Sequence, residues 1–471
     1  MPLSLLLLVS SSNPTLPASG HGGPGVSTYT VSGFSSGGSA AINHAVAYSS
    51  SVTGVGVVGG SPYGCSTLPD AENTCSGMMA NWTQNLSIPW DSYLALCNSH
   101  ASSRESAATI DALSNLRRSR AFLFSGLVDD VVFQPVMQAV AAQMRAFFNM
   151  SVRTRFDVPA QHSWVVDQQT CSAPGVGGQP HACCGLKFPP AEACPADVSN
   201  YELPSAGCCG SCGAGSHPDD AWWWPPINQC EGVDLSGEML SFLLGEDSRR
   251  ARRDEDAALD RRDESSSGRG GRAAEANGRH EPAGTSAPTT APRRRRDGLR
   301  RVPPLLANLV ELNQTALLAE LQTTAAAAYL DDVGWAYVPK RCRGGLRAAV
   351  LGAPSRARSG AAAPAAPAAP RPCPVHVHYH ACDGSWRTAS AGYMLGNGLA
   401  SYAEGEGFVL LYPQAAQGGD LQGCWDWYGA TGESTFDTRA GIQLAMVVKM
   451  LELVGVESPG RSAVSQRGNL N

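Results

Sequence analysis

The sequence predicts an α/β fold built around a mostly parallel sheet, and three observations lead to this prediction. Short runs rich in β-branched and aromatic residues alternate with apolar runs of helical length, which is the pattern of strands joined by crossover helices. One strand leads straight into a Gly- and Ser-rich turn and then into an apolar helix. The chain has 471 residues, of which 43% are hydrophobic, so it can bury a sizeable core.

The first folded part is expected over residues 25–245. Its expected elements are a strand at Tyr29–Val31, a helix at Ser36–Tyr48, and strands at Val52–Val58, Arg120–Phe124 and Val152–Phe156. Residues 171–230 are rich in Cys, Pro and Gly, and we expect them to form a disulfide-tied surface excursion. The pair Cys209 and Cys212 has the spacing of half a zinc knuckle, but it lacks a clear second half, so disulfides are favoured over metal.

The second folded part is expected over residues 303–455, with an Ala/Pro-rich insert at 343–372. Strands are expected at Val375–Tyr379 and Gly407–Tyr412, and a helix at Thr438–Leu453. Residues 246–302 are charged and of low complexity, so we expect a disordered linker, with a processing site or an anion-binding patch as alternatives for its basic run. Residues 456–471 form a tail. Because neither folded part looks complete alone, both are expected to contribute strands to one sheet.

Charge and cysteine content limit the partners and the compartment. Lys and Arg number 35 against 41 Asp and Glu, which gives a net charge of −6 and argues against nucleic acid as a main partner. No run of about 20 apolar residues is present, so no membrane-spanning helix is expected. The 15 cysteines favour an oxidising compartment, and their odd number leaves at least one thiol unpaired or shared between chains. Glycosylation sequons agree with a secreted glycoprotein and lie at Asn81, Asn85, Asn149 and Asn313.

Residues 1–24 are signal-like, because an apolar run at Leu3–Val9 precedes the small residues Pro17–Ser19. No Lys or Arg stands before this run, and the run is short. The alternative is a cytoplasmic protein with a disordered apolar start.

The segment Gly33–Gly37 has the pattern G-x-S-x-G. A strand precedes it and an apolar helix follows, as the nucleophile elbow of an α/β-hydrolase requires. The pattern therefore predicts Ser35 as a nucleophile, with the backbone N–H of Ser36 helping to stabilise an oxyanion. The alternative is a Gly/Ser turn with no chemistry.

A serine nucleophile needs a base and an orienting acid, which follow it along the chain of an α/β-hydrolase. Asp129 and Asp130 come after the strand at 120–124, and either could be the acid. His162 lies in a loop just past the strand at 152–156, where a base belongs. His100 and His181 have the correct order too, but neither follows a clear strand.

Several blocks together carry a family resemblance. They are Val31–Gly38, Ala45–Ser49, Phe124–Val132, Gln161–His162, Pro226–Cys230, Gly237–Leu240, Tyr337–Lys340, Val375–Cys382, Leu411–Ala415 and Gly423–Gly429. In these blocks the chain resembles the secreted poly(3-hydroxybutyrate) depolymerases, which are serine esterases with an α/β-hydrolase fold. The resemblance implies Ser35 as nucleophile, Asp129 as acid and His162 as base, with no cofactor and a polyester as substrate.

The resemblance also implies a binding site and an unusual chain order. The family's H-G-C motif falls on His380-Ala381-Cys382, which makes the N–H of Cys382 the second oxyanion donor, although Ala381 replaces the family's Gly. Trp425 falls on the aromatic block that holds the polyester, where an exposed ring would be a flat apolar platform. In a standard α/β-hydrolase the oxyanion strand precedes the nucleophile, whereas Cys382 comes long after Ser35. A circular permutation would produce this order.

Other functions remain open at this point. A feruloyl or acetyl-type plant-wall esterase would use the same residues on another ester. His376, His378 and His380 alternate along a strand and precede Asp383, so a zinc hydrolase is a further hypothesis, although the resemblance places two of these histidines inside a buried strand. A degenerate secreted binding protein is the non-enzymatic alternative, against which the intact Ser35, Asp129 and His162 argue.

Overall fold

The computed structural model describes residues 26–76, 89–127, 129, 131–167, 210–212, 227–230, 232–245, 308–345, 373–417 and 421–457. The signal-like segment, the charged linker, the C-terminal tail from residue 458, and most of the Cys-rich excursion and of the Ala/Pro-rich insert lie outside the described residues. So do Asp130, His181 and the sequons at Asn81 and Asn85. What the sequence predicts for these segments stays a prediction.

An eight-stranded sheet forms the centre of the protein, in the order β4-β3-β2-β1-β10-β11-β9-β8. All neighbouring pairs from β4 to β11 are parallel, and β9 is antiparallel to both of its neighbours. The mostly parallel α/β sheet is therefore confirmed. The strands are β1 (Tyr29–Phe34), β2 (Val52–Val58), β3 (Arg120–Phe124), β4 (Ser151–Arg155), β8 (Leu309–Asn313), β9 (Val333–Tyr337), β10 (Val375–Tyr379) and β11 (Val409–Tyr412).

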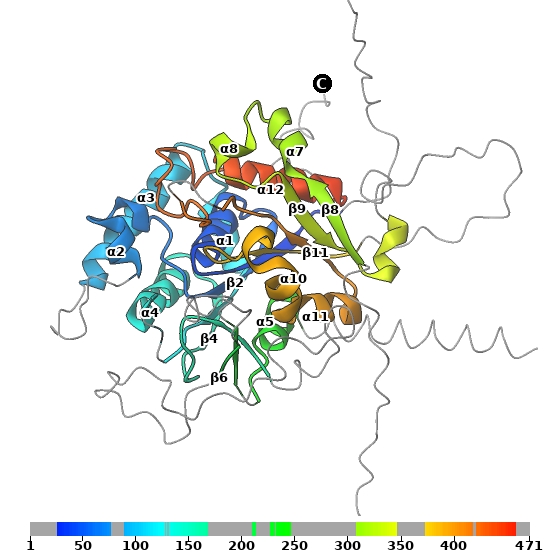
Figure 1. The fold of residues 1–471 in the computed structure, drawn as a ribbon. Coiled ribbons are helices and arrows are strands. Elements are labelled where there is room, and N and C mark those ends of the chain that lie inside the picture. The colour runs from blue at the N-terminus through cyan, green and yellow to red at the C-terminus, as the bar shows by residue number, and fades with distance from the viewer. Residues whose placement is uncertain are drawn as a thin grey trace, which may run out of the picture.

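Helices cover both faces of this sheet (Figure 1). The central strands are buried on both sides and are rich in Val, Leu and aromatic residues, as expected for parallel strands, although β1 and β10 also carry buried polar side chains. One face packs against α1 (Ser36–Ala47), α3 (Trp90–Ser106), α4 (Gln134–Ala142), α7 (Gln314–Glu320) and α12 (Ile442–Leu453). The other face packs against α5 (Leu235–Leu244), α10 (Trp386–Gly396) and α11 (Leu399–Glu406). Two further α-helices are short: α2 (Ala71–Ser76) and α8 (Ala325–Ala328). The other short helical segments are η1 (Cys65–Thr67), η3 (Leu113–Arg118), η4 (Gln143–Phe147) and η9 (Lys340–Gly345).

A small second sheet joins a strand that precedes the Cys-rich stretch to two strands that lie within it. It has the order β5-β7-β6 and consists of β5 (Trp164–Val166), β6 (Gly210–Cys212) and β7 (Ile227–Gln229). Cys230, directly after β7, is disulfide-bonded. The other disulfides of the described residues join Cys65 to Cys75, Cys342 to Cys373, and Cys382 to Cys424. None of the described helices is long and apolar enough to span a membrane.

The two parts of the chain meet in the middle of the large sheet, where β1 pairs with β10. If the strands are counted from β8 to β11 and then from β1 to β4, the sheet order becomes 1-2-4-3-5-6-7-8. In this count the oxyanion strand β10 precedes the nucleophile strand β1, as in a standard α/β-hydrolase. The first and last described residues also lie together, because Val26 forms a parallel bridge with Val456 and the carbonyl of Val26 accepts a 2.9 Å hydrogen bond from the N–H of Glu457. The strand order is therefore that of a circular permutation.

Candidate active site

Ser35 occupies the turn between β1 and α1, with φ 60° and ψ −125°. A non-glycine residue with this backbone conformation is strained and persists only where its surroundings hold it. The N–H of Ser35 donates to the carbonyl of Val58 at 2.8 Å. A Cβ atom on Gly33 would lie 1.9 Å from the carbonyl oxygen of Gly37, so only glycine fits at that position. The turn has the features that the G-x-S-x-G pattern predicts for a nucleophile elbow.

Asp129 and His162 come together from the loops that follow β3 and β4. The Nδ1 atom of His162 lies 2.9 Å from Oδ2 and 3.1 Å from Oδ1 of Asp129. Oδ1 of Asp129 also accepts hydrogen bonds from the N–H groups of Val131 (3.1 Å) and Val132 (2.9 Å). The carboxylate is thus fixed by the backbone behind it, and it orients the imidazole with Nδ1 as the protonated nitrogen.

The other ring nitrogen of His162, Nε2, is buried and has no hydrogen-bond partner among the described residues. The imidazole packs on Phe34, with ring centroids 4.8 Å apart, so it lies beside the residue that precedes Ser35. A Cβ atom on Gly59 would be 2.9 Å from its Cε1 atom, so glycine at this position leaves room for the ring. The site therefore presents an oriented base with a vacant acceptor next to the elbow.

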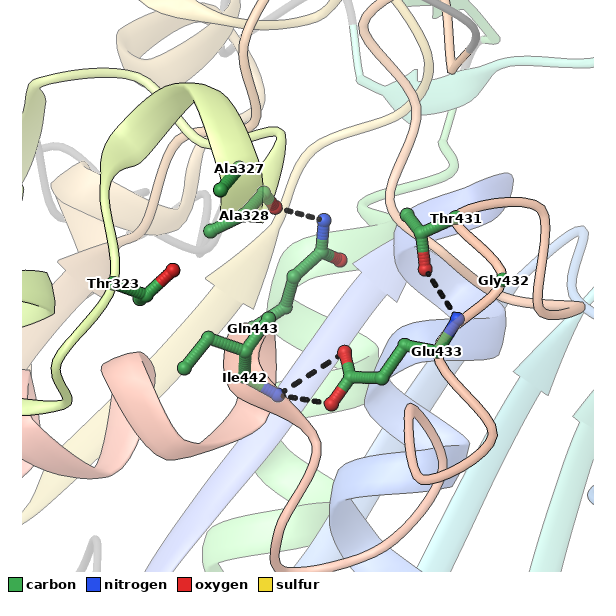
Figure 2. Close-up of a pocket in the computed structure, with 8 residues that line it drawn as sticks. All are labelled: Thr323, Ala327, Ala328, Thr431, Gly432, Glu433, Ile442 and Gln443. Atoms are coloured by element: carbon green, nitrogen blue, oxygen red, sulfur yellow. Dashed lines mark hydrogen bonds between the residues drawn. The ribbon is translucent and has the colours of Figure 1, made fainter.

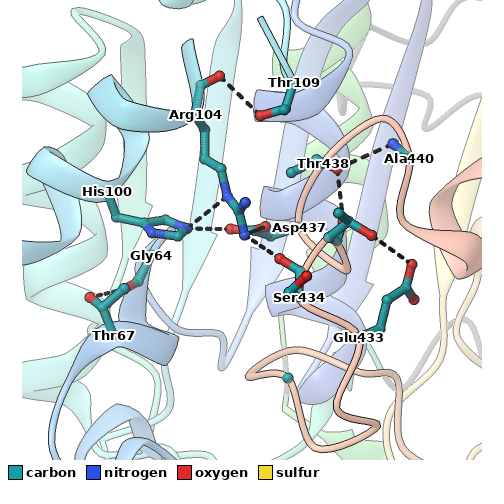
Figure 3. Close-up of polar contacts among 12 residues, drawn as sticks. Gly64, Thr67, His100, Arg104, Thr109, Glu433, Ser434, Asp437, Thr438 and Ala440 are labelled. Carbon is teal, nitrogen blue, oxygen red and sulfur yellow. Dashed lines mark hydrogen bonds and ion pairs between the residues drawn. The ribbon is translucent and has the colours of Figure 1, made fainter. Parts of the chain in front are cut away.

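His100, the rival base within the described residues, belongs to a separate polar cluster (Figure 3). Its Nε2 lies 2.6 Å from Oδ2 of Asp437, whose side chain is 1% exposed. Arg104 also pairs with Asp437, at 2.8 Å, and donates to the carbonyl of Ser434. These contacts join α3 to the segment before α12, and neither His100 nor Asp437 follows a strand of the sheet.

The loop after β10 packs directly on the start of α1. A Cβ atom on Gly37 would come within 2.3 Å of the carbonyl oxygen of His380. Ser36 is the first residue of α1, so its N–H has no acceptor inside the helix. The N–H of Cys382 makes no backbone hydrogen bond within the described ranges. Among the described residues, the N–H groups of Ser36 and Cys382, one from each part of the chain, thus make no backbone hydrogen bond that would prevent them from acting as donors.

Trp425 fastens these two segments together. Its backbone N–H donates to Oγ of Ser36 at 3.3 Å, and its indole N–H donates to the carbonyl of His380 at 3.0 Å. Cys424, the residue before Trp425, forms a disulfide with Cys382. The Trp425 side chain is 0% exposed, so the expectation of an exposed platform is wrong for this ring. The sequence motif could not distinguish a ring that holds substrate from one that holds the loop.

The three alternating histidines are occupied by other partners. Nδ1 and Nε2 of His376 contact Thr30 and Ser32, and those of His378 contact Ser32 and Tyr393. His380 donates from Nδ1 to the carbonyl of Ala381 and accepts at Nε2 from the N–H of Ala415. Burial lowers the pKa of His376 to about 3 and that of His380 to about 4. Because all six ring nitrogens are hydrogen-bonded, these residues do not form a metal ligand set.

A cavity of about 420 Å³ lies between α8 and the N-terminus of α12 (Figure 2). Its lining includes Glu433, whose carboxylate accepts from the backbone N–H of Ile442 at 3.1 Å, and Gln443, which donates to the carbonyl of Ala328 at 3.0 Å. Both polar side chains therefore cap or join helices. None of the candidate site residues predicted from the sequence lines this cavity.

No protein-family model matches the chain. The chain is 25% identical over 437 residues to a poly(3-hydroxybutyrate) depolymerase of Delftia acidovorans, covering 92% of this chain and 60% of that protein. It is 26% identical over 137 residues to a polyhydroxybutyrate depolymerase of Talaromyces funiculosus, covering 26% of this chain and 33% of that protein. The chain thus spans about 60% and a third of the lengths of these two relatives.

Among solved structures, the fold is similar to that of a PHB depolymerase from Penicillium funiculosum. The TM-score is 0.50 at 20% identity, and the match covers 92% of this chain and 98% of that structure. At 20% sequence identity, this match shows that the two proteins have a similar fold. The resemblance stated from the motifs is therefore confirmed: the chain is related in sequence to the poly(3-hydroxybutyrate) depolymerases and has the α/β-hydrolase fold of one of them.

Proposed function

We propose that this protein is a secreted serine esterase that hydrolyses poly(3-hydroxybutyrate) or its oligomers. The single observation that carries the proposal is the His162 imidazole, which is held at Nδ1 by Asp129 while its buried Nε2, beside the strained Ser35 turn, has no partner among the residues that the structure describes. This arrangement matches the requirements of a Ser-His-Asp triad. The names of the relatives support the choice of substrate.

In the proposed mechanism, Oγ of Ser35 attacks the ester carbonyl and passes its proton to Nε2 of His162. Asp129 holds the correct tautomer and stabilises the imidazolium that forms. The N–H groups of Ser36 and Cys382 stabilise the oxyanion. His162 then protonates the leaving alcohol, and a water molecule activated by His162 releases the acid from the acyl-enzyme. This chemistry uses only groups of the protein itself.

The disulfides of the described residues fit an oxidising, extracellular setting, which is where an insoluble polyester would be met. The Cys382–Cys424 bond lies in the proposed oxyanion loop. Secretion and the active site are therefore linked in this proposal, since a reducing compartment would open that bond.

The test compares the release of 3-hydroxybutyrate from a polyester film by the wild type, Ser35→Ala and the control Ser119→Ala. Ser119 is a buried serine at the start of β3, whose hydroxyl donates to the carbonyl of Val52 at 2.8 Å. We expect clearing by the wild type and the control, and loss of activity in Ser35→Ala by a factor of at least about 10³. Release of ferulate or acetate from plant-wall esters without film clearing would contradict the substrate. Retained hydrolysis in Ser35→Ala would contradict the mechanism.

A further inference from the structure

A chain of buried polar side chains runs along one face of the β1–β10 pair. Oγ1 of Thr30 lies 2.8 Å from Nδ1 of His376, and Oγ of Ser32 lies 2.8 Å both from Nε2 of His376 and from Nδ1 of His378. The chain ends at the hydroxyl of Tyr393 on α10, 3.0 Å from Nε2 of His378. None of these five residues is more than 3% exposed.

This chain of bonds lies inside an otherwise apolar layer. Trp164 meets His378 edge-on at 4.9 Å between ring centroids, and Phe408 lies near His376. A buried polar group without a hydrogen-bond partner destabilises the folded state, so we expect polar residues in such a layer to be paired. Both histidines are neutral, because burial lowers their pKa, to about 3 for His376.

The bonds cross the seam between the two parts of the chain in a fixed register. Thr30 is level with His376, and Ser32 is level with His378. Ser32 stands three residues before Ser35, and His378 stands four residues before Cys382. A slip of one residue between β1 and β10 would turn these side chains to opposite faces and would separate the nucleophile from the oxyanion loop.

The hydroxyl of Ser32 couples the two histidines. It can donate only one hydrogen, so it must donate to one ring and accept from the other. The tautomers of His376 and His378 are therefore linked, and the whole chain of bonds has one direction from Thr30 to Tyr393 or the reverse. Ser32 is its central member, and its loss leaves two ring nitrogens without a partner.

We propose that Ser32, His376 and His378 are positioning residues that hold the strand of the nucleophile in register with the strand of the oxyanion loop. The proposal rests on the proposed function. It differs from a purely structural role because it predicts a loss of turnover in molecules that remain folded. The bonded residues of β1 and β10 lie 344 to 346 positions apart in the sequence, so local chain connection does not set the register of the two strands.

The experiment measures kcat and KM of Ser32→Ala for p-nitrophenyl butyrate, with active sites counted by fluorophosphonate titration. We expect kcat per titrated site to fall by about tenfold or more with KM within twofold, because small misplacement of reacting groups lowers turnover. The matched control is Ser119→Ala, which removes a buried serine hydrogen bond between β2 and β3, with kcat expected within twofold.

A second pair of variants, both at Thr30, tests the same proposal if Ser32→Ala does not fold. Thr30→Val keeps the shape of the side chain but removes the bond to His376, whereas Thr30→Ser keeps the hydroxyl. We expect Thr30→Val to lower kcat by about threefold and Thr30→Ser to restore it. Unchanged kcat in Ser32→Ala or in Thr30→Val, or an equal loss in Ser119→Ala, would overturn the proposal. A wild type without esterase activity would instead overturn the proposed function.

Discussion

The indole N–H of Trp425 donates to the carbonyl oxygen of His380 at 3.0 Å. This bond ties an aromatic side chain from the loop after β11 to the first residue after β10. Because Trp425 also bonds Ser36 through its backbone, one buried residue aligns the nucleophile elbow and the proposed oxyanion loop.

Replacing Trp425 by Phe keeps an aromatic ring but removes the bond to His380. We expect kcat to fall by about tenfold, because the oxyanion loop loses one of its fixed positions, and adsorption to a polyester film to remain unchanged. The control is Trp427→Phe, since Trp427 is partly buried against a different cluster and packs at a tilt against Tyr428. A selective loss of adsorption in Trp425→Phe would show instead that the ring binds polymer.

Gly37→Ala should displace the oxyanion loop from the elbow. The added Cβ would lie 2.3 Å from a backbone oxygen of His380, which cannot rotate away as a side chain can. We expect kcat for a soluble ester to fall by about 100-fold. Gly405→Ala on α11 is the matched control, because a Cβ there meets nothing within 4 Å. Wild-type kcat in Gly37→Ala would contradict the close approach of α1 and the loop.

Stability should fall as the pH falls below about 6.5. Burial lowers the pKa of His44 to about 3, whereas an unfolded histidine has a pKa of about 6.5. Between these two pKa values the unfolded chain binds a proton that the folded chain excludes. Each such histidine therefore lowers the free energy of unfolding by about 1.4 kcal/mol for every unit by which the pH falls. Above pH 6.5 the histidine is neutral in both states and contributes no slope.

Urea unfolding at pH 7 and pH 5 measures this dependence. The wild type should be less stable at pH 5, and His44→Gln should show a smaller difference between the two values. His44 bonds Tyr29 and Tyr379, so the variant will be less stable at both pH values and only the slope is diagnostic. Equal stability of the wild type at both values would contradict the burial of neutral histidines.

A permuted variant tests the origin of the strand order. Val26 and Val456 form a parallel bridge, so a short linker can join residue 457 to residue 26 while new termini are placed at residues 308 and 245. We expect this variant to fold and to keep its esterase activity within about threefold, because the sheet pairs and the site are unchanged. An aggregated or inactive product, with the wild type active, would count against the permutation.

Much of the fold could be predicted from local patterns. The strands at Val52–Val58, Arg120–Phe124 and Val375–Tyr379 have the predicted limits, since each is a short run rich in β-branched or aromatic residues. The predicted helix at Thr438 begins only at Ile442, because Thr438 and Gly441 instead form turns bonded to Thr435 and to Thr438. Helix α3 was not predicted, and its sequence has almost no apolar periodicity.

The site could be predicted only in part. The order of strands and loops predicted His162 as the base but left Asp129 and Asp130 open as the acid, and the family resemblance selected Asp129. In the structure Asp129 and His162 form a hydrogen-bonded pair. The burial of Trp425 could not be predicted, because a motif does not show which neighbours surround a ring. The partners of His376 and His378 depend on the register of strands far apart in sequence, and their alternation alone fits a metal site equally well.

In the proposed triad Ser35 is the nucleophile, and Asp129 and His162 activate it. The most direct measurement is peptide mapping by mass spectrometry after reaction with a fluorophosphonate. We expect an adduct on Ser35 in the wild type, none in Ser35→Ala, and labelling in Asp129→Asn slowed by about 10³-fold or more because the imidazole adopts the wrong tautomer. An adduct on another residue, or wild-type labelling of Ser35 in Asp129→Asn, would contradict the proposed triad.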